Sequence, residues 1–422
     1  MPLRRRVPTW TELRPLVRLE RPSLSAEARL GRASTIEDLR TKAKRRTPRS
    51  VFDYVDGAAE SELSMLRARD AFDAVEFRPR VLRDVAHVDA SMDLLGVTGP
   101  IPLILSPTGF TRMMHHEGEW AVGRAAARAG IPYTLSTMGT VSVEDLAADV
   151  PGLQRWFQLY LWQDREASTA LIRRAAAAGF ETLVLTVDTA VGGQRLRDVR
   201  NGLTVPPALT PRTVAGMARH PRWWANVLTS EAIEFASLRS SSGTVADLVD
   251  RMFDPTLQLQ DLAWLREEWA GRIVVKGIQH PQDARELVDL GVDGIIVSNH
   301  GGRQLDRAAA PLELLPEVVD EVGGQVPVLL DGGVMNGADI VAAVALGADA
   351  VMAGRAYLYG LMAGGEAGVD RALEILVSQV HRTLRLLGAR RLADVRGSGQ
   401  VRLRHSTTPA ITAYQAHQGE TL

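Results

Sequence analysis

The 422-residue sequence contains no cysteine, which excludes disulfide bonds, thiolate nucleophiles and cysteine-ligated metal sites together. It also lacks any apolar run near the about 20 residues that a transmembrane helix needs. The basic residues at 1–6 are not followed by an apolar stretch of signal-peptide length. We therefore expect a cytoplasmic protein, and peripheral attachment to the inner face of the cell membrane stays open.

An excess of either charge is also missing, because 49 Lys and Arg residues and 50 Asp and Glu residues leave a formal net charge of -1. A nucleic-acid-binding protein would carry a strong basic excess, so we expect no nucleic-acid partner. No G-x-G-x-x-G segment occurs, which argues against a Rossmann nicotinamide site. What remains is a globular chain long enough to bury a sizeable core.

From residue 100 onward, eight short apolar runs alternate with alanine-rich segments of helical period, such as 119–129, 167–178, 281–290 and 338–346. Eight strands alternating with helices predict an α/β fold, a (β/α)8 TIM barrel, with a doubly wound sheet as the alternative. The runs end near Ser106, Leu135, Tyr160, Val187, Lys276, Ser298, Asp331 and Gly354.

The spacing of these runs predicts the domain organisation. We expect an N-terminal arm at 1–45 with a short helix, a barrel domain at 46–390 that opens with a helix over 49–65, and a tail at 391–422. The fourth and fifth runs are much further apart than the others, which predicts an insertion at about 202–262. Because it leaves from the C-terminal end of a strand, the insertion is a candidate lid or membrane contact, with a surface elaboration as the alternative.

The stretch from Gly294 to Asp306 is the most informative. The β-branched run 294–297 predicts a strand buried on both faces, and Ser298, His300 and Arg303 follow it. A histidine at the mouth of such a strand can take a proton, and an arginine can bind a carboxylate through two parallel hydrogen bonds. An isolated pair of this kind more often has a structural role. The residues at the other strand ends therefore decide between a structural and a catalytic role.

Polar residues also follow the other runs, and the C-terminal ends of barrel strands meet at one rim, where active sites lie. Glycines after the seventh and eighth runs are placed as in barrels that bind a phosphate with backbone N–H groups. Lys276 ends a buried strand and is either a Schiff-base lysine or a cation that stabilises a reduced cofactor. The residues concerned are Pro107, Thr108, Gly109, Ser136, Gln158, Tyr160, Thr186, Asp188, Asp331, Gly333, Gly354 and Arg355.

A metal site is not expected. His115, His116 and Glu117 are adjacent, but the H-E-x-x-H spacing is absent. Neighbouring histidines on a helix would point in different directions, and three inward-facing ligands are not visible.

The chain resembles the FMN-dependent α-hydroxy acid oxidases and dehydrogenases, a family that includes glycolate oxidase, mandelate dehydrogenase and respiratory L-lactate dehydrogenases. The resemblance covers about 35–390, and the N-terminal arm and the segments 197–202 and 355–368 look most similar to actinobacterial L-lactate dehydrogenases. The segments that carry it are Tyr54-x-x-Gly57-Ala58, Pro107-Thr108-Gly109, Glu117-Gly118-Glu119, Gln158-Leu159-Tyr160, Thr186-Val187-Asp188, Lys276-Gly277, Ser298 to Asp306 and Asp331-Gly332-Gly333.

The resemblance implies FMN on the barrel rim and oxidation of an L-2-hydroxy acid to a 2-keto acid. His300 would be the base, either for the α-proton or for the hydroxyl proton, with Asp188 stabilising its imidazolium. Tyr160 would hydrogen-bond the substrate oxygen, and Lys276 would stabilise the reduced flavin. The substrate carboxylate would bind Arg303 and Arg195, with a hydroxyl from Tyr54. The flavin ring would be held by Pro107, Thr108, Gly109, Ser136, Gln158 and Thr186, and the ribityl chain and phosphate by Ser298, Asp331, Gly333, Gly354 and Arg355.

The chain departs from the family pattern at three places. Met335 and Asn336 stand where many members carry an arginine after D-G-G, which shifts the expected phosphate charge toward Arg355. Met138 replaces an aromatic residue of the glycolate oxidase pocket, which leaves the side-chain preference open. Gly109 replaces an alanine held against the flavin, a position that could alter reactivity with oxygen.

Several functions remain possible at this stage. The leading hypothesis is an FMN-dependent L-lactate dehydrogenase that passes electrons to quinone or another external acceptor, since no haem segment precedes residue 35. The alternatives within the family are a hydrogen-peroxide-forming oxidase and an enzyme for a larger acid such as a mandelate. An FMN-dependent barrel isomerase and a flavin-binding scaffold lie outside it. The family resemblance further implies a homo-oligomer, commonly a tetramer.

Overall fold

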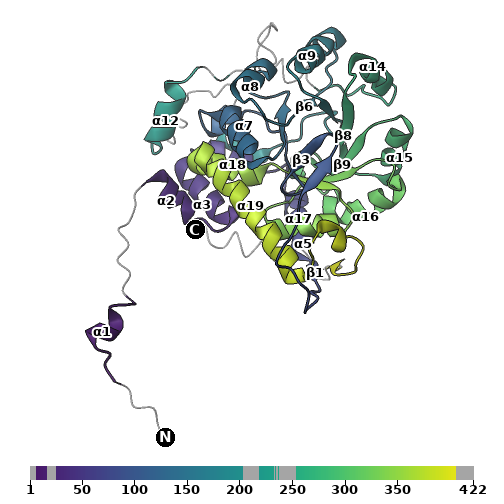
Figure 1. The fold of residues 1–422 in the computed structure, drawn as a ribbon. Helices are drawn as coiled ribbons and strands as arrows, with labels where there is room; N and C mark the ends of the chain where they lie inside the picture. The colour runs from purple at the N-terminus through teal and green to yellow at the C-terminus, as the bar shows by residue number, and fades with distance from the viewer. Residues whose placement is uncertain are drawn as a thin grey trace.

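A closed barrel of eight parallel strands forms the centre of the computed structural model, which describes residues 6–16, 25–202, 218–231, 233, 236 and 253–404. The strands run around the barrel in the order β10-β11-β4-β5-β6-β7-β8-β9, with helices outside them (Figure 1). The predicted (β/α)8 barrel is therefore confirmed. Its strands are β4 (Leu103–Leu105), β5 (Tyr133–Ser136), β6 (Arg155–Leu159), β7 (Thr182–Thr186), β8 (Arg272–Ile278), β9 (Gly294–Ser298), β10 (Val328–Asp331) and β11 (Ala350–Ala353).

The four alanine-rich segments predicted as helices are confirmed to within two residues at each end, as α7, α9, α15 and α17. Side-chain caps explain where two of them begin: Asp164 accepts from the N–H of Ala167, and Asn336 forms a capping box with Asp339. The barrel helices are α7 (Gly118–Ala129), α8 (Val143–Asp149), α9 (Arg165–Ala177), α14 (Asp261–Glu268), α15 (Pro281–Asp289), α16 (Pro311–Val322), α17 (Gly337–Ala345), α18 (Arg355–Gly364) and α19 (Glu366–Leu387).

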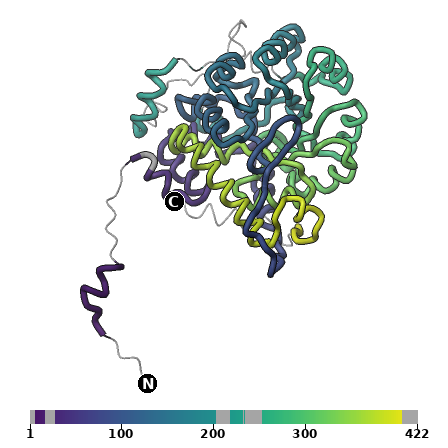
Figure 2. Tube along the Cα trace, viewed as in Figure 1, coloured from purple at the N-terminus to yellow at the C-terminus, as the bar shows by residue number. Residues whose placement is uncertain are grey.

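The segment before the barrel contains α1 (Trp10–Leu13), α2 (Ala26–Gly31), α3 (Ile36–Arg46), α4 (Arg49–Asp56) and α5 (Leu63–Asp73). Helix α3 packs against α18 although the two are distant in sequence (Figure 2). The single helix expected over 49–65 is wrong. The chain leaves the helix at Gly57, Glu62 has a left-handed φ of 64°, and Asp306 accepts the N–H groups of Ser61 and Ser64. These long-range bonds outweigh the local preference for one continuous helix.

Short strands lie outside the barrel. Strand β1 (Val75–Phe77) pairs antiparallel with β12 (Val401–Leu403), and β2 (Met92–Leu94) pairs antiparallel with β3 (Val97–Gly99). The predicted insertion is described only in part, as α12 (Pro221–Leu228) and the residues around it; 203–217 and 237–252 lie outside the described residues, as does 405–422 of the tail. In the described part of the chain, no helix is long and apolar enough to cross a membrane.

The inside of the barrel has two layers. The lower layer is an apolar cluster that includes Ile104, Trp156, Val184, Val274, Ile296 and Leu329. Because side chains alternate along a strand, the residues two positions later face the same interior. These are Ser106, Gln158, Thr186, Lys276, Ser298 and Asp331, and they form a polar upper layer at the C-terminal ends of the strands.

Candidate active site

A cavity of about 2020 Å³ lies over the C-terminal ends of the barrel strands. Three of the predicted site residues do not line the cavity but form hydrogen bonds to side chains that do. Asp188 contacts His300, Gln158 contacts Ser136, and Ser298 contacts Lys276. The others line the cavity: Tyr54, Pro107, Thr108, Gly109, Ser136, Tyr160, Thr186, Arg195, Lys276, His300, Arg303, Asp331, Gly333, Gly354 and Arg355. The structure thus brings all the predicted site residues together.

His300 is held from two sides. Its Nδ1 lies 3.0 Å from Asp188 Oδ1, and its backbone N–H donates to Ser298 Oγ over 3.0 Å. Its φ of 58° is unusual for a residue with a Cβ, and the loop after β9 imposes it. A carboxylate at Nδ1 favours the tautomer with a proton there, so Nε2 carries the lone pair that can accept a proton.

Tyr160 lies beside the free nitrogen of this histidine, with 3.5 Å between its Oη and Nε2 of His300. Burial and then the Asp188 carboxylate raise the pKa of the Tyr160 hydroxyl. The phenol is therefore protonated at neutral pH and can donate a hydrogen bond to an oxygen bound next to His300.

Two guanidinium groups flank one aromatic ring. Arg303 lies 4.9 Å and Arg195 5.4 Å from the ring centre of Tyr54. Arg195 pairs with Asp198 at 3.0 Å, whereas no carboxylate of the described residues forms a salt bridge with Arg303. Burial, reinforced by Arg195, lowers the pKa of Arg303 to about 10, so it is still a cation at neutral pH. This end of the cavity is suited to an anion.

A buried ion pair occupies the centre of the rim. Lys276 Nζ lies 2.8 Å from Asp331 Oδ2 and 2.9 Å from Ser298 Oγ. Burial opposes ionisation of Asp331, but Lys276, Ser298 and Ser106 hold its pKa below the usual range. An ammonium group paired in this way is a poor nucleophile, so the geometry favours the fixed cation over the Schiff-base alternative.

The polar rim fits a flat heteroaromatic cofactor with a phosphate. Gln158 Nε2 and Thr186 Oγ1 are buried without a hydrogen-bond partner within the described part of the chain. Such atoms are costly unless a polar ligand completes them. Helix α18 begins at Gly354 without a side-chain cap, and unpaired N–H groups at a helix N-terminus can hold a phosphate. The residues present therefore fit FMN.

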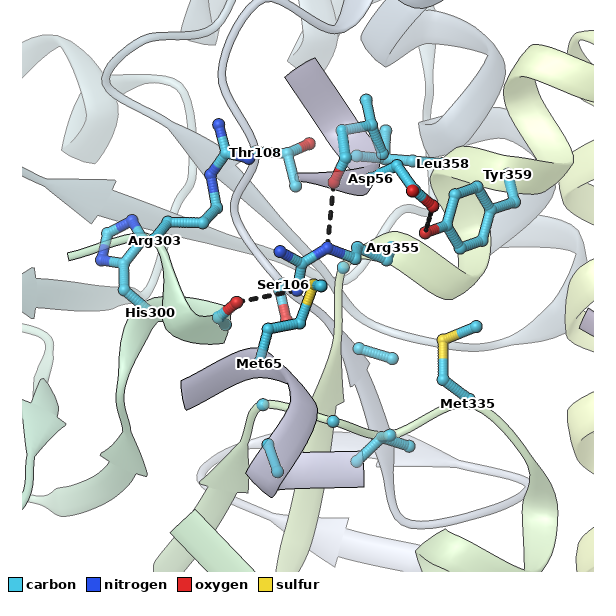
Figure 3. Close-up of a pocket in the computed structure, with 18 of the residues that line it drawn as sticks. Asp56, Met65, Ser106, Thr108, His300, Arg303, Met335, Arg355, Leu358 and Tyr359 are labelled. Atoms are coloured by element: carbon cyan, nitrogen blue, oxygen red, sulfur yellow. Dashed lines mark hydrogen bonds between the residues drawn. The ribbon is translucent and has the colours of Figure 1, made fainter. Parts of the chain in front are cut away.

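Arg355 has a further set of contacts that the sequence did not predict. Its guanidinium donates to the carbonyl oxygens of Val55 (2.9 Å), Gly57 (2.8 Å) and Gly301 (2.9 Å). Figure 3 shows it between His300 and Met335. Arg303 donates to the carbonyls of Tyr54 and Gly57. Two arginines thus cap the C-terminus of α4 and tie it to the loop that carries His300.

A charged network next to the cavity was also missed. The buried carboxylate of Asp56 accepts from Arg40 (2.5 Å), Arg197 (3.1 Å) and Tyr359 (2.8 Å). Arg197 also binds Glu62, and Arg197 belongs to α10 (Leu196–Asn201), directly after Arg195. The network therefore fastens the segment that carries Arg195 to helix α4, which carries Tyr54. No local sequence pattern marks it, because its members come from separate segments.

The expectation that His115 and His116 lie on a helix and point in different directions is wrong. His115 and His116 follow the short helix α6 (Thr111–Met114), and their ring centres are 4.5 Å apart. Together with Glu117 their potential ligand atoms lie within 4.8 Å of one another. Burial, and then the neighbouring His116, lowers the pKa of His115 to about 4. The absence of a metal stays a prediction.

The chain is similar to flavin-dependent dehydrogenases in sequence and in structure. Residues 43–402 match the family model described as FMN-dependent dehydrogenase. The chain is 57% identical over 396 residues to a Mycobacterium tuberculosis protein named "Putative L-lactate dehydrogenase", covering 94% of this chain and 96% of that protein. It is 41% identical over 369 residues to L-lactate dehydrogenase of Caulobacter vibrioides, covering 86% and 96%. A crystal structure of the monotopic membrane protein (S)-mandelate dehydrogenase superposes with a TM-score of 0.85 and 38% identity, covering 88% of this chain and all of that one.

Proposed function

The chain belongs to the FMN-dependent dehydrogenases, and we propose that it oxidises a small L-2-hydroxy acid, L-lactate to pyruvate in the first place. As a member of that family it is an oxidoreductase that uses FMN. The observation that carries the proposal is that the His300 and Asp188 pair and the partly buried Arg303 cation meet at one cavity. A base next to an anion site is what removal of a proton from a hydroxy acid requires.

The chain's own groups account for the proton and the charge. Oxidation of the alcohol carbon removes two electrons and two protons. When bound, FMN would accept both electrons and one of the protons, and the other proton goes to a base of the protein. Nε2 of His300 takes a proton, from the α-carbon or from the hydroxyl, and Asp188 stabilises the imidazolium that results. The protonated hydroxyl of Tyr160 donates to the substrate oxygen.

The carboxylate of the substrate orients the reacting carbon. Arg303 offers a planar fork that matches a carboxylate, and Arg195 and the hydroxyl of Tyr54 complete the anion site. Binding to Arg195 competes with its ion pair to Asp198. The anion site therefore has one cation, Arg303, without a carboxylate partner among the described residues, and one, Arg195, that exchanges its partner.

We further propose that the predicted cofactor residues hold FMN on the rim. Gln158, Ser136 and Thr186, with the backbone from Pro107 to Gly109, face the ring, and Lys276 supplies the fixed positive charge beside it. The ribityl chain and phosphate lie toward Ser298, Asp331, Gly333, Gly354 and Arg355. The lack of an arginine at Met335 makes the backbone N–H groups of this end more important.

Electrons leave to a quinone or another external acceptor, with a peroxide-forming oxidase as the alternative. Related mandelate dehydrogenase is described as a monotopic membrane protein, and a peripheral membrane contact fits α12. Leu228 on that helix is 71% exposed, whereas Trp223 is buried and donates to the carbonyl of Met113. Assembly as a homo-oligomer, a tetramer by family resemblance, belongs to the same proposal.

The test is anaerobic stopped-flow absorbance of the FMN-loaded protein mixed with L-lactate, with D-lactate as the control. We expect bleaching by the L-isomer and slow recovery in air if the acceptor is a quinone. Fast recovery in air would favour the oxidase. Absence of bleaching by L-lactate and by a panel of larger L-2-hydroxy acids would overturn the proposed function and favour the isomerase alternative.

A further inference from the structure

The insertion after β7 returns to the barrel at the substrate end of the cavity. Phe253, the first residue described after 237–252, lines the same cavity as Tyr160, His300 and Arg303. Its ring packs edge-on against Tyr160, with ring centres 5.6 Å apart and an interplanar angle of 77°. The predicted insertion therefore contributes an aromatic side chain to the wall of the site.

The next residue fixes the position of Phe253. Asp254 is buried, forms an ion pair with Arg165 at 3.0 Å, and accepts from the backbone N–H of Thr256 at 2.9 Å. Arg165 is also paired with Asp261, at 2.9 Å, at the start of α14. A ring whose backbone is anchored in this way has little freedom to move aside for a larger ligand.

Phe253 also lies against Gly192, which has no side chain. A Cβ on Gly192 would lie 3.6 Å from the Phe253 ring, so the ring lies against the loop that leads to Arg195. Phe253 is therefore enclosed between Tyr160 and the loop after β7. Because its ring contacts Tyr160, the group proposed to bind the substrate oxygen, Phe253 is close to the place that the proposal leaves for the third substituent of the α-carbon.

The side chains proposed to bind the substrate differ from Phe253 because they are polar. His300, Tyr160, Arg195 and Arg303 are all polar or charged at their tips, whereas Phe253 and Met138 are apolar residues that line the same cavity. Met138 is a flexible thioether that can change its shape around different ligands. A ring fixed by two rotatable bonds sets a stricter limit.

We propose that Phe253 is a specificity-determining residue that limits the side chain of the substrate to short aliphatic groups. The inference rests on the proposed function and names its substrate class: L-2-hydroxy acids with small alkyl side chains are accepted, and those with an aryl group on the α-carbon are poor substrates. The insertion thus limits the size of the substrate through Phe253, the residue at which it returns to the barrel.

The test compares Phe253→Ala and Phe253→Leu with wild type, using flavin bleaching by L-lactate, L-2-hydroxybutyrate and (S)-mandelate. We expect Phe253→Ala to raise the ratio of kcat/KM for mandelate over lactate by at least about tenfold, since even one methylene of misfit in a pocket changes kcat/KM by about 10- to 200-fold. Phe253→Leu keeps most of the bulk and should shift the ratio less. The matched control is Leu386→Ala, because Leu386 lines the outer part of the same cavity and is 70% exposed.

A binding measurement separates this inference from the proposed function. Pyruvate and benzoylformate are titrated into the FMN-loaded proteins, and their dissociation constants are read from the flavin spectrum without turnover. Tighter benzoylformate binding in Phe253→Ala with unchanged pyruvate binding supports the size limit even if no acid bleaches the flavin. An equal change for small and large ligands, or no change in either alanine or leucine variant, overturns it.

Discussion

Two layers of side chains inside the barrel, two residues apart on the same strands, have opposite chemistry. On β8 the lower layer holds Val274 and the upper layer Lys276; on β9 they hold Ile296 and Ser298. Both layers are buried, so burial alone does not distinguish them. The lower layer needs no partner beyond contact, whereas each polar group above it must be satisfied by a neighbour or by a ligand.

The residues that stabilise the barrel and the residues of the candidate site are therefore only about 7 Å apart along each strand. The lower layer can be changed only at the cost of packing, and the barrel depends on it. The upper layer forms hydrogen bonds among its members but leaves Gln158 Nε2 and Thr186 Oγ1 without partners in the described part of the chain. An enzyme can thus present a polar site on a fold whose core lies one strand repeat below.

The largest expected effect comes from the residue proposed as the base. His300→Gln should lower the rate of flavin reduction by L-lactate by about 10² to 10⁴, the range for loss of a general base. FMN binding and the thermal midpoint should stay near wild type, because the side chain lies in the loop after β9 and not in the packed interior. Stopped-flow reduction and a thermal melt measure both. Near-normal reduction would remove His300 as the base.

Trp156→Ala tests the lower layer. Trp156 is fully buried in that cluster, so its truncation should destabilise the folded protein by about 3–5 kcal/mol through the cavity it leaves. Trp156→Phe is the matched control and should cost less than about 1.5 kcal/mol, since most of the volume is kept. Urea unfolding of the FMN-free protein measures the difference. A small effect for Trp156→Ala would mean that the lower layer is not the stabilising one.

Lys276→Met places an apolar side chain, like those of the lower layer, in the polar upper layer. Removing one partner of a buried ion pair should destabilise the protein by about 3–5 kcal/mol, because Asp331 is left as an uncompensated buried charge. Adding Asp331→Asn should recover part of that loss. The comparison uses urea unfolding of the three FMN-free proteins at neutral pH. Equal stability of the single variant and wild type would show that the pair is not buried as described.

The same pair gives the stability a pH dependence with a definite sign. Asp331 has a folded pKa below its unfolded value, so its contribution is fully present above about pH 4. It is lost as the pH falls through the lower folded pKa. In Lys276→Met the cation is gone and burial raises the folded pKa of Asp331 above its unfolded value. The sign then reverses: the stability of this variant should rise as the pH falls, because protonation removes the uncompensated buried charge. Urea unfolding between pH 3 and pH 7 distinguishes the two profiles.

The strand ends could be predicted from the sequence because each is a local pattern, an apolar run followed by polar residues. Lys276, Ser298 and Asp331 were placed on one rim by that pattern alone, and their contacts of 2.8 to 2.9 Å agree with it. Parallel strands bring their C-terminal ends to one edge, so the prediction needed no long-range information.

The parts that were missed depend on contacts between distant segments. Asp306 accepts N–H groups from Ser61 and Ser64, and these bonds break the helix expected over 49–65. Arg355 binds three carbonyls from two other segments, and Phe253 reaches the site only because the insertion returns there. No periodicity in the sequence predicts such long-range contacts, because none of the residues involved belongs to a recognisable local motif.

The smallest effect concerns the loop outside both layers. Arg303→Lys should raise KM for L-lactate about tenfold, because an ammonium group makes one charged hydrogen bond where the fork makes two, a loss of about 1.4 kcal/mol. The maximal rate should change less than KM, since His300 keeps its bond to Asp188. Arg200→Lys is a matched control, because Arg200 lines the same cavity and is exposed. Steady-state kinetics with an artificial electron acceptor give both constants. A KM that stays at the wild-type value would count against Arg303 as the carboxylate-binding group and would leave Arg195 as the main cation of the anion site.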